Sequence, residues 1–358
     1  MKREIMAKTA NSVIGIDLGK HQFKAVLLQR KGEQRYVLTN FASRVVPETI
    51  GSVDDFAQQV KLLLKDLGGS AKACAVAASD PRALLRIIEQ PSTPVELLRS
   101  ALRLNGLAVL NQECKDFVLD CAPISAVAVA GVGPKGTAIE GVTTGKTRYL
   151  VGGLLRPEVK HISEAMTKTR MPANILQLGP VCSLNAFEFA YPETFQNEAF
   201  LLLDMGHLQS TVLIGQKTEL VLARSVGYGG KQFMESLAAE GAVDSEGARL
   251  LVQQGDPGMA EICQRALLGL ATEVRNSIGF FEGQCEESIH RIFVSGAMSK
   301  AEMILQSLSD ELGLPCEVWD PLERCEVALP AAKRQALAAE FVSLNVACGA
   351  AISYLKAA

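Results

Sequence analysis

The sequence predicts an α/β protein of two lobes, each built on a mixed β-sheet, with a smaller α+β insert in the first lobe. One unit, an apolar strand, an Asp-x-Gly turn and a second apolar strand, occurs twice, at Asp17 and at Asp204. The two aspartates are 204 − 17 = 187 positions apart, a whole-domain separation rather than a short repeat. At 358 residues the chain also exceeds one ordinary hydrophobic core. Duplication of a domain explains both observations.

The first copy of the unit opens a series of strands followed by a helix. We predict strands at residues 13–16, 23–28, 36–41 and 72–78 and a helix at 56–67. The helix is indicated by apolar residues at helical spacing, with Asp54 at the N-cap position and Gly68 as its stop. Strands followed by a helical crossover are typical of a mixed sheet covered by helices.

The middle of the chain, residues 80–170, is predicted to form the inserted subdomain. Its expected elements are helical segments at 81–89, 94–104 and 162–168 and strands near 117–119, 126–132 and 148–152. The first-lobe core then comprises residues 12–79 and 171–198, closed by a C-terminal helix at 345–355. The second lobe comprises residues 199–344.

The second copy of the unit opens the second lobe. We predict strands at 200–203, 210–214, 219–226 and 291–294 and helices at 232–240, 245–254 and 261–282. The last of these strands ends in the small-residue turn Ser295-Gly296-Ala297, where a flat ring or a ribose could approach the backbone closely.

Composition restricts the classes of function. A net charge of −3 with a pI near 5.9 gives no basic surface for nucleic acid, so we expect none to bind. Nine cysteines without a C-x-x-C pair lie in apolar segments and are expected to be reduced core thiols of a cytosolic protein. No run approaches the ~18 apolar residues of a membrane span, so no direct membrane insertion is expected.

Each Asp-x-Gly turn can serve a phosphate site. Backbone amides around the glycine can approach a phosphate, while the aspartate holds the waters of a Mg²⁺ that neutralises it. Any hairpin can carry Asp-x-Gly in its turn, so one copy alone would indicate only a turn. Two copies at the same place in two similar hairpins favour a facing pair that clamps one ligand.

These segments resemble those of actin-like ATPases, which have two lobes with duplicated, ribonuclease H-like sheets. Residues 15–19 (GIDLG) with 23–26 (FKAV) resemble the first phosphate segment, 203–206 (LDMG) with Ser210 and Thr211 the second, and 295–297 (SGA) the adenosine motif. Within that superfamily the chain is most similar to the PilM family of type IV pilus assembly proteins. That likeness lies in 88–97 (IEQPSTPVEL), 224–230 (RSVGYGG), 312–318 (LGLPCEV) and the terminal helix.

The resemblance implies ATP with Mg²⁺ bound between the lobes. It assigns cofactor contacts to Asp17, Gly19, Lys20, Lys24, Asp204, Gly206, Ser210, Thr211, Gly229, Gly230, Ser295, Gly296 and Ala297, and water-mediated Mg²⁺ binding to Asp17 and Asp204. For catalysis only Asp204 and Gln209 are candidates, so we expect at most weak ATP hydrolysis. The implied partners are a PilN-like cytoplasmic tail peptide and other pilus-assembly proteins, at the cytoplasmic face of the inner membrane.

Several residues depart from the superfamily pattern. Lys20 and His21 stand where small hydroxyl residues are usual, Ala297 replaces a second glycine, and Arg249 and Val252 stand where an acidic residue and a lysine are usual. Two further interpretations therefore stay open: a nucleotide-independent scaffold with a degenerate site, and a small-molecule kinase.

The two histidines that follow the turns, His21 and His207, lack metal-ligand spacing. We expect surface imidazoles rather than a zinc site.

Overall fold

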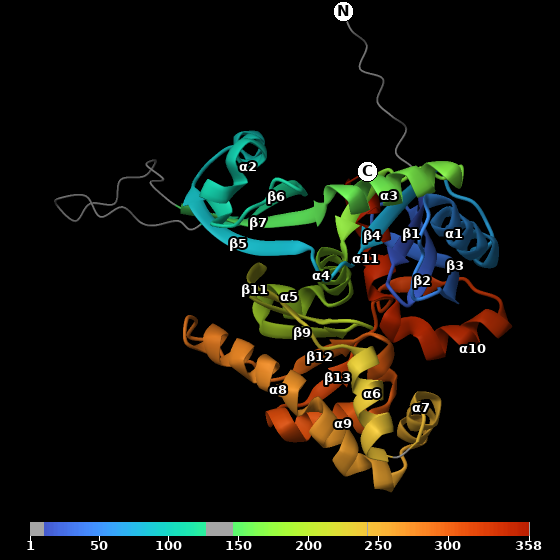
Figure 1. Ribbon diagram of the computed structural model, residues 1–358. Helices are drawn as coiled ribbons and strands as arrows, with labels where there is room; N and C mark the ends of the chain where they lie inside the picture. The colour runs from blue at the N-terminus through green and yellow to red at the C-terminus, as the bar shows by residue number, and fades with distance from the viewer. Residues whose placement is uncertain (1–10, 127–145, 242, 358) are drawn as a thin grey trace, which may run out of the picture.

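The computed structural model describes residues 11–126, 146–241 and 243–357. It contains a six-stranded sheet, a five-stranded sheet and a three-stranded sheet, with helices packed on them. Figure 1 shows three bodies: the first lobe around the six-stranded sheet, the second lobe below it around the five-stranded sheet, and the insert to one side. The predicted two-lobed α/β fold with an insert is confirmed.

The first-lobe sheet has the strand order β14-β3-β2-β1-β4-β8. Its strands are β1 (Ser12–Leu18), β2 (Gln22–Lys31), β3 (Arg35–Val45), β4 (Ala73–Ala78), β8 (Ile175–Leu178) and β14 (Cys325–Val327). The strands β1, β2 and β3 are antiparallel neighbours, whereas β4 runs parallel to β1 and β8 parallel to β4. Six consecutive buried residues in both β1 and β4 reflect a sheet covered on both faces.

The second-lobe sheet repeats this arrangement in the order β11-β10-β9-β12-β13. Its strands are β9 (Ala199–Met205), β10 (Ser210–Gln216), β11 (Glu219–Val226), β12 (Ile292–Ser295) and β13 (Cys316–Val318). Again the first three strands are antiparallel and the last two are parallel to β9 and to β12. The equivalent topology confirms the duplication that the paired Asp-x-Gly units indicated.

Helices cover the first-lobe sheet on both faces. The helices α1 (Val53–Leu67) and α3 (Arg156–Lys168) share one hydrophobic cluster with the sheet, and α4 (Gly179–Ala190) and α11 (Asn345–Ala357) contribute to a second cluster. The N-cap predicted at Asp54 is wrong: Ser52 caps α1, its side chain accepting a hydrogen bond from the backbone N–H of Asp55. A hydroxyl caps a helix as well as a carboxylate does, and Ser52 precedes the first helical turn.

Five further helices in the described part of the chain belong to the second lobe or pack against its sheet. They are α5 (Pro192–Asn197), α6 (Gly230–Gly241), α7 (Ser245–Gln254), α8 (Ala260–Glu282) and α9 (Glu302–Leu312), with short 3₁₀ turns at Pro257–Met259 and Ala297–Lys300. One cluster joins α6, α7, α8 and α9 to the sheet through Phe233, Val252, Leu270 and Leu308.

The insert contains β5 (Leu84–Pro91), α2 (Val95–Leu110), β6 (Phe117–Ala126) and β7 (Lys146–Leu155), with strand order β5-β7-β6. The helix predicted at 81–89 is wrong, because Leu84–Pro91 pairs antiparallel with β7. Adjacent β-branched Ile87 and Ile88 suit a strand, and pairing with a distant segment decides the conformation there. The strand predicted at 126–132 lies almost wholly outside the described residues.

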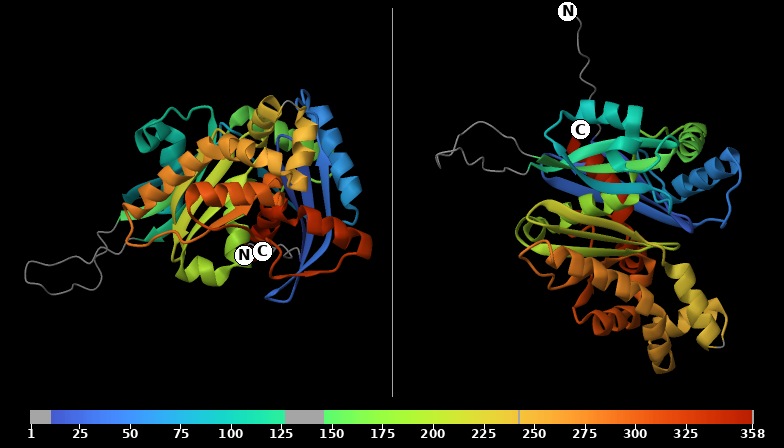
Figure 2. Two further views of the ribbon diagram at one scale, coloured as in Figure 1. Left: turned by 90° about the horizontal axis from the view of Figure 1, so that it is seen from below. Right: turned by 60° about the vertical axis from the view of Figure 1, so that its left-hand side comes forward.

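The C-terminal part of the chain returns to the first lobe. The strand β14 extends the first-lobe sheet beside β3, and α10 (Ala331–Glu340), followed by a 3₁₀ turn at Phe341–Ser343, places Lys333 against Asn40 and the carbonyl oxygen of Phe41. Figures 1 and 2 show α10 and α11, in red, beside the blue first-lobe strands. The chain therefore passes from the first lobe to the second and returns to the first lobe at β14.

Two expectations from composition can be compared with the structure. All nine cysteines lie within the described residues and are free thiols, six of them buried. Among the described helices, none is by itself long and apolar enough to cross a membrane; the segments Ala331–Ser343 and Asn345–Ala357 reach that length and composition only together, bent by 90°.

Candidate functional site

The two predicted turns have equivalent backbone geometry. Each lies at the tip of a hairpin, β1–β2 in the first lobe and β9–β10 in the second. A Cβ atom on Gly19 would lie 2.7 Å from the carbonyl oxygen of Gln22, and one on Gly206 would lie 2.6 Å from that of Gln209. Both turns therefore require glycine for the same close approach. The site is built from two copies of one loop.

The first-lobe carboxylate, Asp17, is almost fully buried at the end of β1. It lies opposite Lys24 in the β1–β2 register, and the Lys24 Nζ is 3.6 Å from its Oδ2. Burial raises the pKa of Asp17 to about 6; the Lys24 ammonium opposes this rise, and the negative charge of Asp204 adds to it. The charge of one predicted carboxylate thus acts on the other from the second lobe.

The second-lobe carboxylate, Asp204, is held by neutral donors. The Ser295 hydroxyl donates to its Oδ1 at 2.8 Å, and the Asn345 Nδ2 donates to the same oxygen at 3.2 Å. The same Asn345 amide lies 3.0 Å from the Ser183 hydroxyl oxygen in α4. The sequence prediction found Ser295 but missed Asn345, whose only signal is a polar residue beginning an apolar helix.

The two histidines connect the tips of the two lobes. The rings of His21 and His207 stack with centroids 4.4 Å apart and an interplanar angle of 20°. They come from the tips of the two equivalent hairpins. Among the described residues, no group of three or more His, Cys, Asp or Glu side chains could hold a metal ion directly. His21 is exposed and His207 half-buried, as expected for surface imidazoles. Their stacking was not predicted, because sequence spacing says nothing about partners in different lobes.

Lys20 is engaged outside the space between the tips. Its Nζ lies 3.3 Å from Asp80 Oδ2 and 3.2 Å from Glu158 Oε1. Burial opposes ionisation of Asp80, but hydrogen bonds and charge from Arg82 and Lys20 outweigh it and hold the Asp80 pKa well below its usual value. The Lys20 side chain thus fastens the first tip to the segment before β5 and to α3.

The remaining phosphate-side residues support the second tip. The Ser210 hydroxyl donates to the carbonyl oxygen of Tyr228 at 2.7 Å, and Thr211 lies opposite Asp204 in the β9–β10 register. Gly229 and Gly230 are buried at the start of α6, and the Gly230 N–H donates to the carbonyl oxygen of Gly206 at 2.9 Å. The start of α6 is therefore fixed directly against the turn.

The adenosine-side turn follows β12. Gly296 has φ +96°, and a Cβ there would lie 2.3 Å from the carbonyl oxygen of Met205, so the turn requires glycine. Ala297 is exposed. On α7, the Arg249 guanidinium binds Glu246 and Gln253 of its own helix, and Val252 is buried in the core. Neither of these α7 side chains replaces the acidic residue and lysine of the superfamily pattern.

The residues present fit a magnesium–phosphate group in their chemistry. Two carboxylates near one another supply the oxygen ligands or water acceptors that Mg²⁺ prefers, and the glycines at both tips allow a close approach to the backbone. The stacked histidine rings bring the two tips into contact. A phosphate chain that lies between these two rings would have to separate them.

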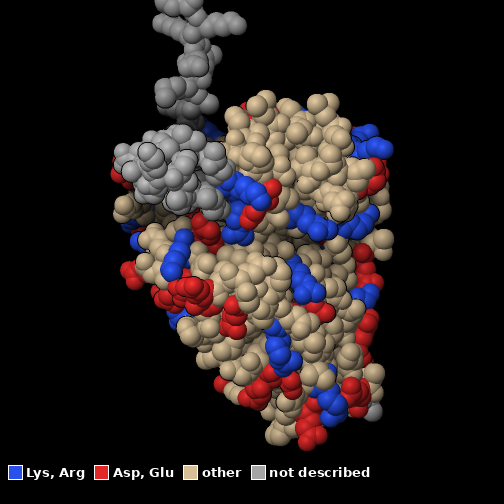
Figure 3. Space-filling view, turned by 90° about the vertical axis from the view of Figure 1, so that its left-hand side faces the viewer, with Lys and Arg blue, Asp and Glu red and all other residues tan. Residues whose placement is uncertain are grey.

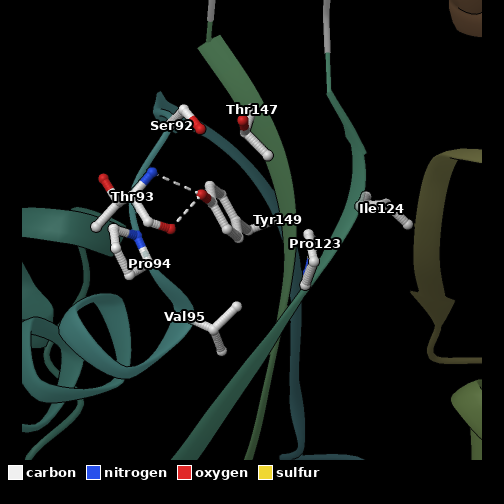
Figure 4. Close-up of a pocket in the computed structure, with 8 residues that line it drawn as sticks. All are labelled: Ser92, Thr93, Pro94, Val95, Pro123, Ile124, Thr147 and Tyr149. Atoms are coloured by element: carbon white, nitrogen blue, oxygen red, sulfur yellow. Dashed lines mark hydrogen bonds between the residues drawn. The ribbon is translucent and has the colours of Figure 1, made fainter.

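Two cavities lie on the insert. One, of about 620 Å³, is lined by Ser92, Thr93, Pro94, Val95, Pro123, Ile124, Thr147 and Tyr149, and Figure 4 shows the Tyr149 hydroxyl bridging the backbone N–H and C=O of Thr93. The other, of about 320 Å³, lies between β5 and β11 and includes three arginines, Arg82, Arg86 and Arg224. In Figure 3, Lys and Arg side chains gather along the boundary between the insert and the second lobe.

The arginines of the smaller cavity are engaged by neighbouring groups. Arg82 pairs with Asp80, Arg224 with Glu273, and Arg86 donates to Gln112. Most of the positive charge in this cavity is therefore compensated within the chain.

Comparison with known proteins identifies relatives over the whole chain. The family model described as type IV pilus assembly protein PilM matches residues 158–354. A solved PilM–PilN type IV pilus biogenesis complex is similar with a TM-score of 0.77 and 23% identity, covering 96% of this chain and 98% of that one. The ethanolamine utilization protein EutJ from Carboxydothermus hydrogenoformans gives 0.51 and 12%, covering 97% and 90%. These likenesses show a two-lobed actin-like ATPase fold.

Proposed function

The chain belongs to the PilM family of type IV pilus assembly proteins, and from this premise we propose that it binds Mg-ATP between its lobes and docks the cytoplasmic tail of a PilN-like inner-membrane protein. The observation that carries the nucleotide part is the pair of equivalent turns, each preceded by a carboxylate, whose tips meet through His21 and His207. The tail-binding part rests on the insert and on the similar PilM–PilN complex.

In this proposal different residues bind the metal ion, the phosphates and the adenosine of Mg-ATP. Asp17 and Asp204 hold waters of the Mg²⁺, and backbone amides near Gly19 and Gly206 approach the phosphates. The turn at Ser295, Gly296 and Ala297 receives the adenosine. Mg²⁺ supplies neutralisation of the phosphate charge.

Calorimetry with Mg-ATP tests the nucleotide part. We expect the wild type to release or absorb binding heat and Asp204→Ala to bind at least about 100-fold more weakly, because charge-assisted hydrogen bonds to the hydrated ion are lost. Asp310→Ala, which removes an exposed carboxylate on α9, is the matched control and should bind like the wild type. Equal heats from wild type and Asp204→Ala would exclude the clamp.

We propose that hydrolysis is weak. The reaction needs a positioned water and a group that orients it, and Gln209 at the second tip is the candidate. Its backbone carbonyl closes against Gly206, so its place is set by the turn itself. Turnover by purified protein at about 1 to 100 per second, the range of kinases, would contradict this assignment and favour the small-molecule kinase.

The insert offers the surface for the tail peptide. Its cavity of about 620 Å³ is lined by apolar groups of Val95, Pro123 and Ile124, and on the neighbouring helix α2 Leu97 and Leu104 are 62% and 87% exposed. Apolar pockets beside exposed leucines are typical of peptide-binding surfaces. Docking here would hold the protein at the cytoplasmic face of the inner membrane through its partner.

A labelled synthetic peptide of the partner's tail tests this assignment by fluorescence anisotropy. Val95→Arg, which places a charge in the cavity, should weaken binding about tenfold or more because a desolvated charge replaces an apolar contact. Leu268→Arg, at an exposed leucine of α8, is the matched control and should leave affinity unchanged. Equal loss in both variants, or in neither, would place the peptide elsewhere.

A nucleotide-independent scaffold is the second candidate. It is favoured by the charge pairing of Asp17 with Lys24, by the stacked histidines and by Arg249 bound to its own helix. It predicts that Asp17→Ala and Asp204→Ala fold normally and bind the tail peptide as the wild type does, with and without Mg-ATP.

A further inference from the structure

The histidines of this chain are distributed unevenly. It has four, and two of them form the stacked pair between the tips. Of the others, His161 on α3 packs edge-on against Phe56, and His290 is exposed before β12. Each turn has one histidine, and these two histidines are in contact.

Hydrogen bonds fix the backbone at both histidines, whereas the rings contact each other only by stacking. The His21 carbonyl oxygen accepts the N–H of Val46 at 2.9 Å, and the His207 carbonyl oxygen accepts the N–H of Lys231 at 2.9 Å. A side-chain rotation can therefore move either imidazole without unfolding its turn.

The surroundings of His207 favour its neutral form. Burial, the facing His21 and the Lys231 ammonium lower the pKa of His207, whereas Glu48 after β3 and Glu235 on α6 raise it more weakly. Two protonated imidazoles at this separation would repel each other. An anion between the tips would reverse this balance, because an imidazolium presents two N–H donors and a positive charge.

We propose that His21 and His207 are a phosphate-contacting pair, whose stacked rings part for a phosphate chain and then donate hydrogen bonds to its oxygens as imidazolium ions. This rests on the proposed nucleotide binding and adds a regulation to it. The protons come from solvent, so binding of the phosphate chain takes up protons near neutral pH and tightens as the pH falls.

Calorimetry of Mg-ATP binding at pH 7.5, in two buffers with different ionisation enthalpies, counts the protons taken up. We expect net uptake by the wild type and an affinity about tenfold higher at pH 6.5 than at pH 8.0 by proton linkage. Mg-pyrophosphate should show the same uptake, and adenosine should show none. Subtracting the values of His21→Gln/His207→Gln removes the protonation of the ligand itself.

The variants separate this role from a structural one. Each single variant, His21→Gln or His207→Gln, should lose part of the uptake and the double variant all of it, with a correspondingly flatter pH profile, while His290→Gln, the matched control, should keep both. A wild type that binds Mg-ATP without proton uptake, or a double variant with the wild-type profile, overturns the histidine assignment alone. Absence of Mg-ATP and Mg-pyrophosphate binding at every pH overturns the nucleotide site together with it.

Discussion

The hairpin of the first lobe and the hairpin of the second lobe have the same backbone but different electrostatics. Both turns bring a glycine against the carbonyl oxygen three residues later. Opposite the aspartate in the strand register, however, the first hairpin has Lys24 and the second has Thr211. One carboxylate is thus balanced by a cation of its own hairpin, and the other lies opposite a neutral hydroxyl residue.

The second carboxylate obtains its partners from elsewhere in the fold. Ser295 comes from the end of β12, and Asn345 begins α11, which packs on the first-lobe sheet. Asp204 therefore connects the second-lobe hairpin to the helix that closes the first lobe. The two turns have the same geometry, but their aspartates have different partners. Asp17 pairs with Lys24 of its own hairpin, whereas Asp204 accepts hydrogen bonds from Ser295 and Asn345.

The largest expected effect concerns the pH dependence caused by Asp17. Its pKa is about 6 in the folded chain against 3.8 as a model value, a rise of 6 − 3.8 = 2.2. Between these values the folded state holds a proton that the unfolded state has released, so stability falls as pH rises. We expect the free energy of unfolding of wild type minus that of Asp17→Asn to fall by about 2 kcal/mol from pH 4 to pH 6.5.

Urea unfolding in magnesium-free buffer measures this difference. Asp80→Asn is the control with the opposite sign, because hydrogen bonds from Arg82 and Lys20 lower the Asp80 pKa. Its stabilising contribution is complete above the unfolded pKa and is lost as the pH falls below 4. A pH-independent difference for Asp17→Asn would mean that Lys24 fully compensates the burial.

The second prediction concerns the connection made by Asn345, which is 2% exposed. Asn345→Ala removes the amide that bonds Asp204 and Ser183 and should lower the free energy of unfolding by about 1 to 3 kcal/mol, since buried polar groups lose a partner. Asn197→Ala, at an exposed asparagine that bonds the Glu193 carbonyl, should cost less than about 0.5 kcal/mol. Equal costs would show that the second hairpin does not depend on α11.

Sequence alone predicted the two tight turns, which depend on local chemistry. The glycines and aspartates of both turns were found because a tight turn between two apolar runs has a recognisable pattern. Asn345 and the His21–His207 contact were missed, since their partners lie in segments distant in the sequence. No local rule specifies such a pair, and only the packing of the lobes creates it.

The same distinction explains the errors in the fold. The first strand of the insert, Leu84–Pro91, was expected to be helical because its local signals are ambiguous, and pairing with Lys146–Leu155 overrides them. The duplicated sheets were predictable because their strands are long apolar runs in the same order. Their edge strands β13 and β14, of three residues each, carry too short a pattern to be recognised.

The smallest expected effect concerns another contact between the two lobes, the ion pair of Lys231 with Glu48. The Lys231 Nζ lies 3.1 Å from Glu48 Oε1, and the two side chains are 42% and 74% exposed. Because solvent screens such a pair, Glu48→Gln should change the free energy of unfolding by less than about 1 kcal/mol. Glu89→Gln removes a comparably exposed pair with Lys146 inside the insert and is the matched control.

Hydrogen exchange distinguishes the two variants where stability does not. The Val46 and Lys231 amides donate to the carbonyls of His21 and His207, so they report on the two tips. If Glu48 holds the tips together, Glu48→Gln exchanges both amides faster than the wild type, and 1 M salt produces the same acceleration in the wild type, where the Debye length is about 3 Å. Faster exchange in Glu89→Gln as well, or in neither variant, would mean that Glu48 does not hold the tips together. The histidine stack and the Asp204–Asn345 hydrogen bond would then account for the contact between the lobes.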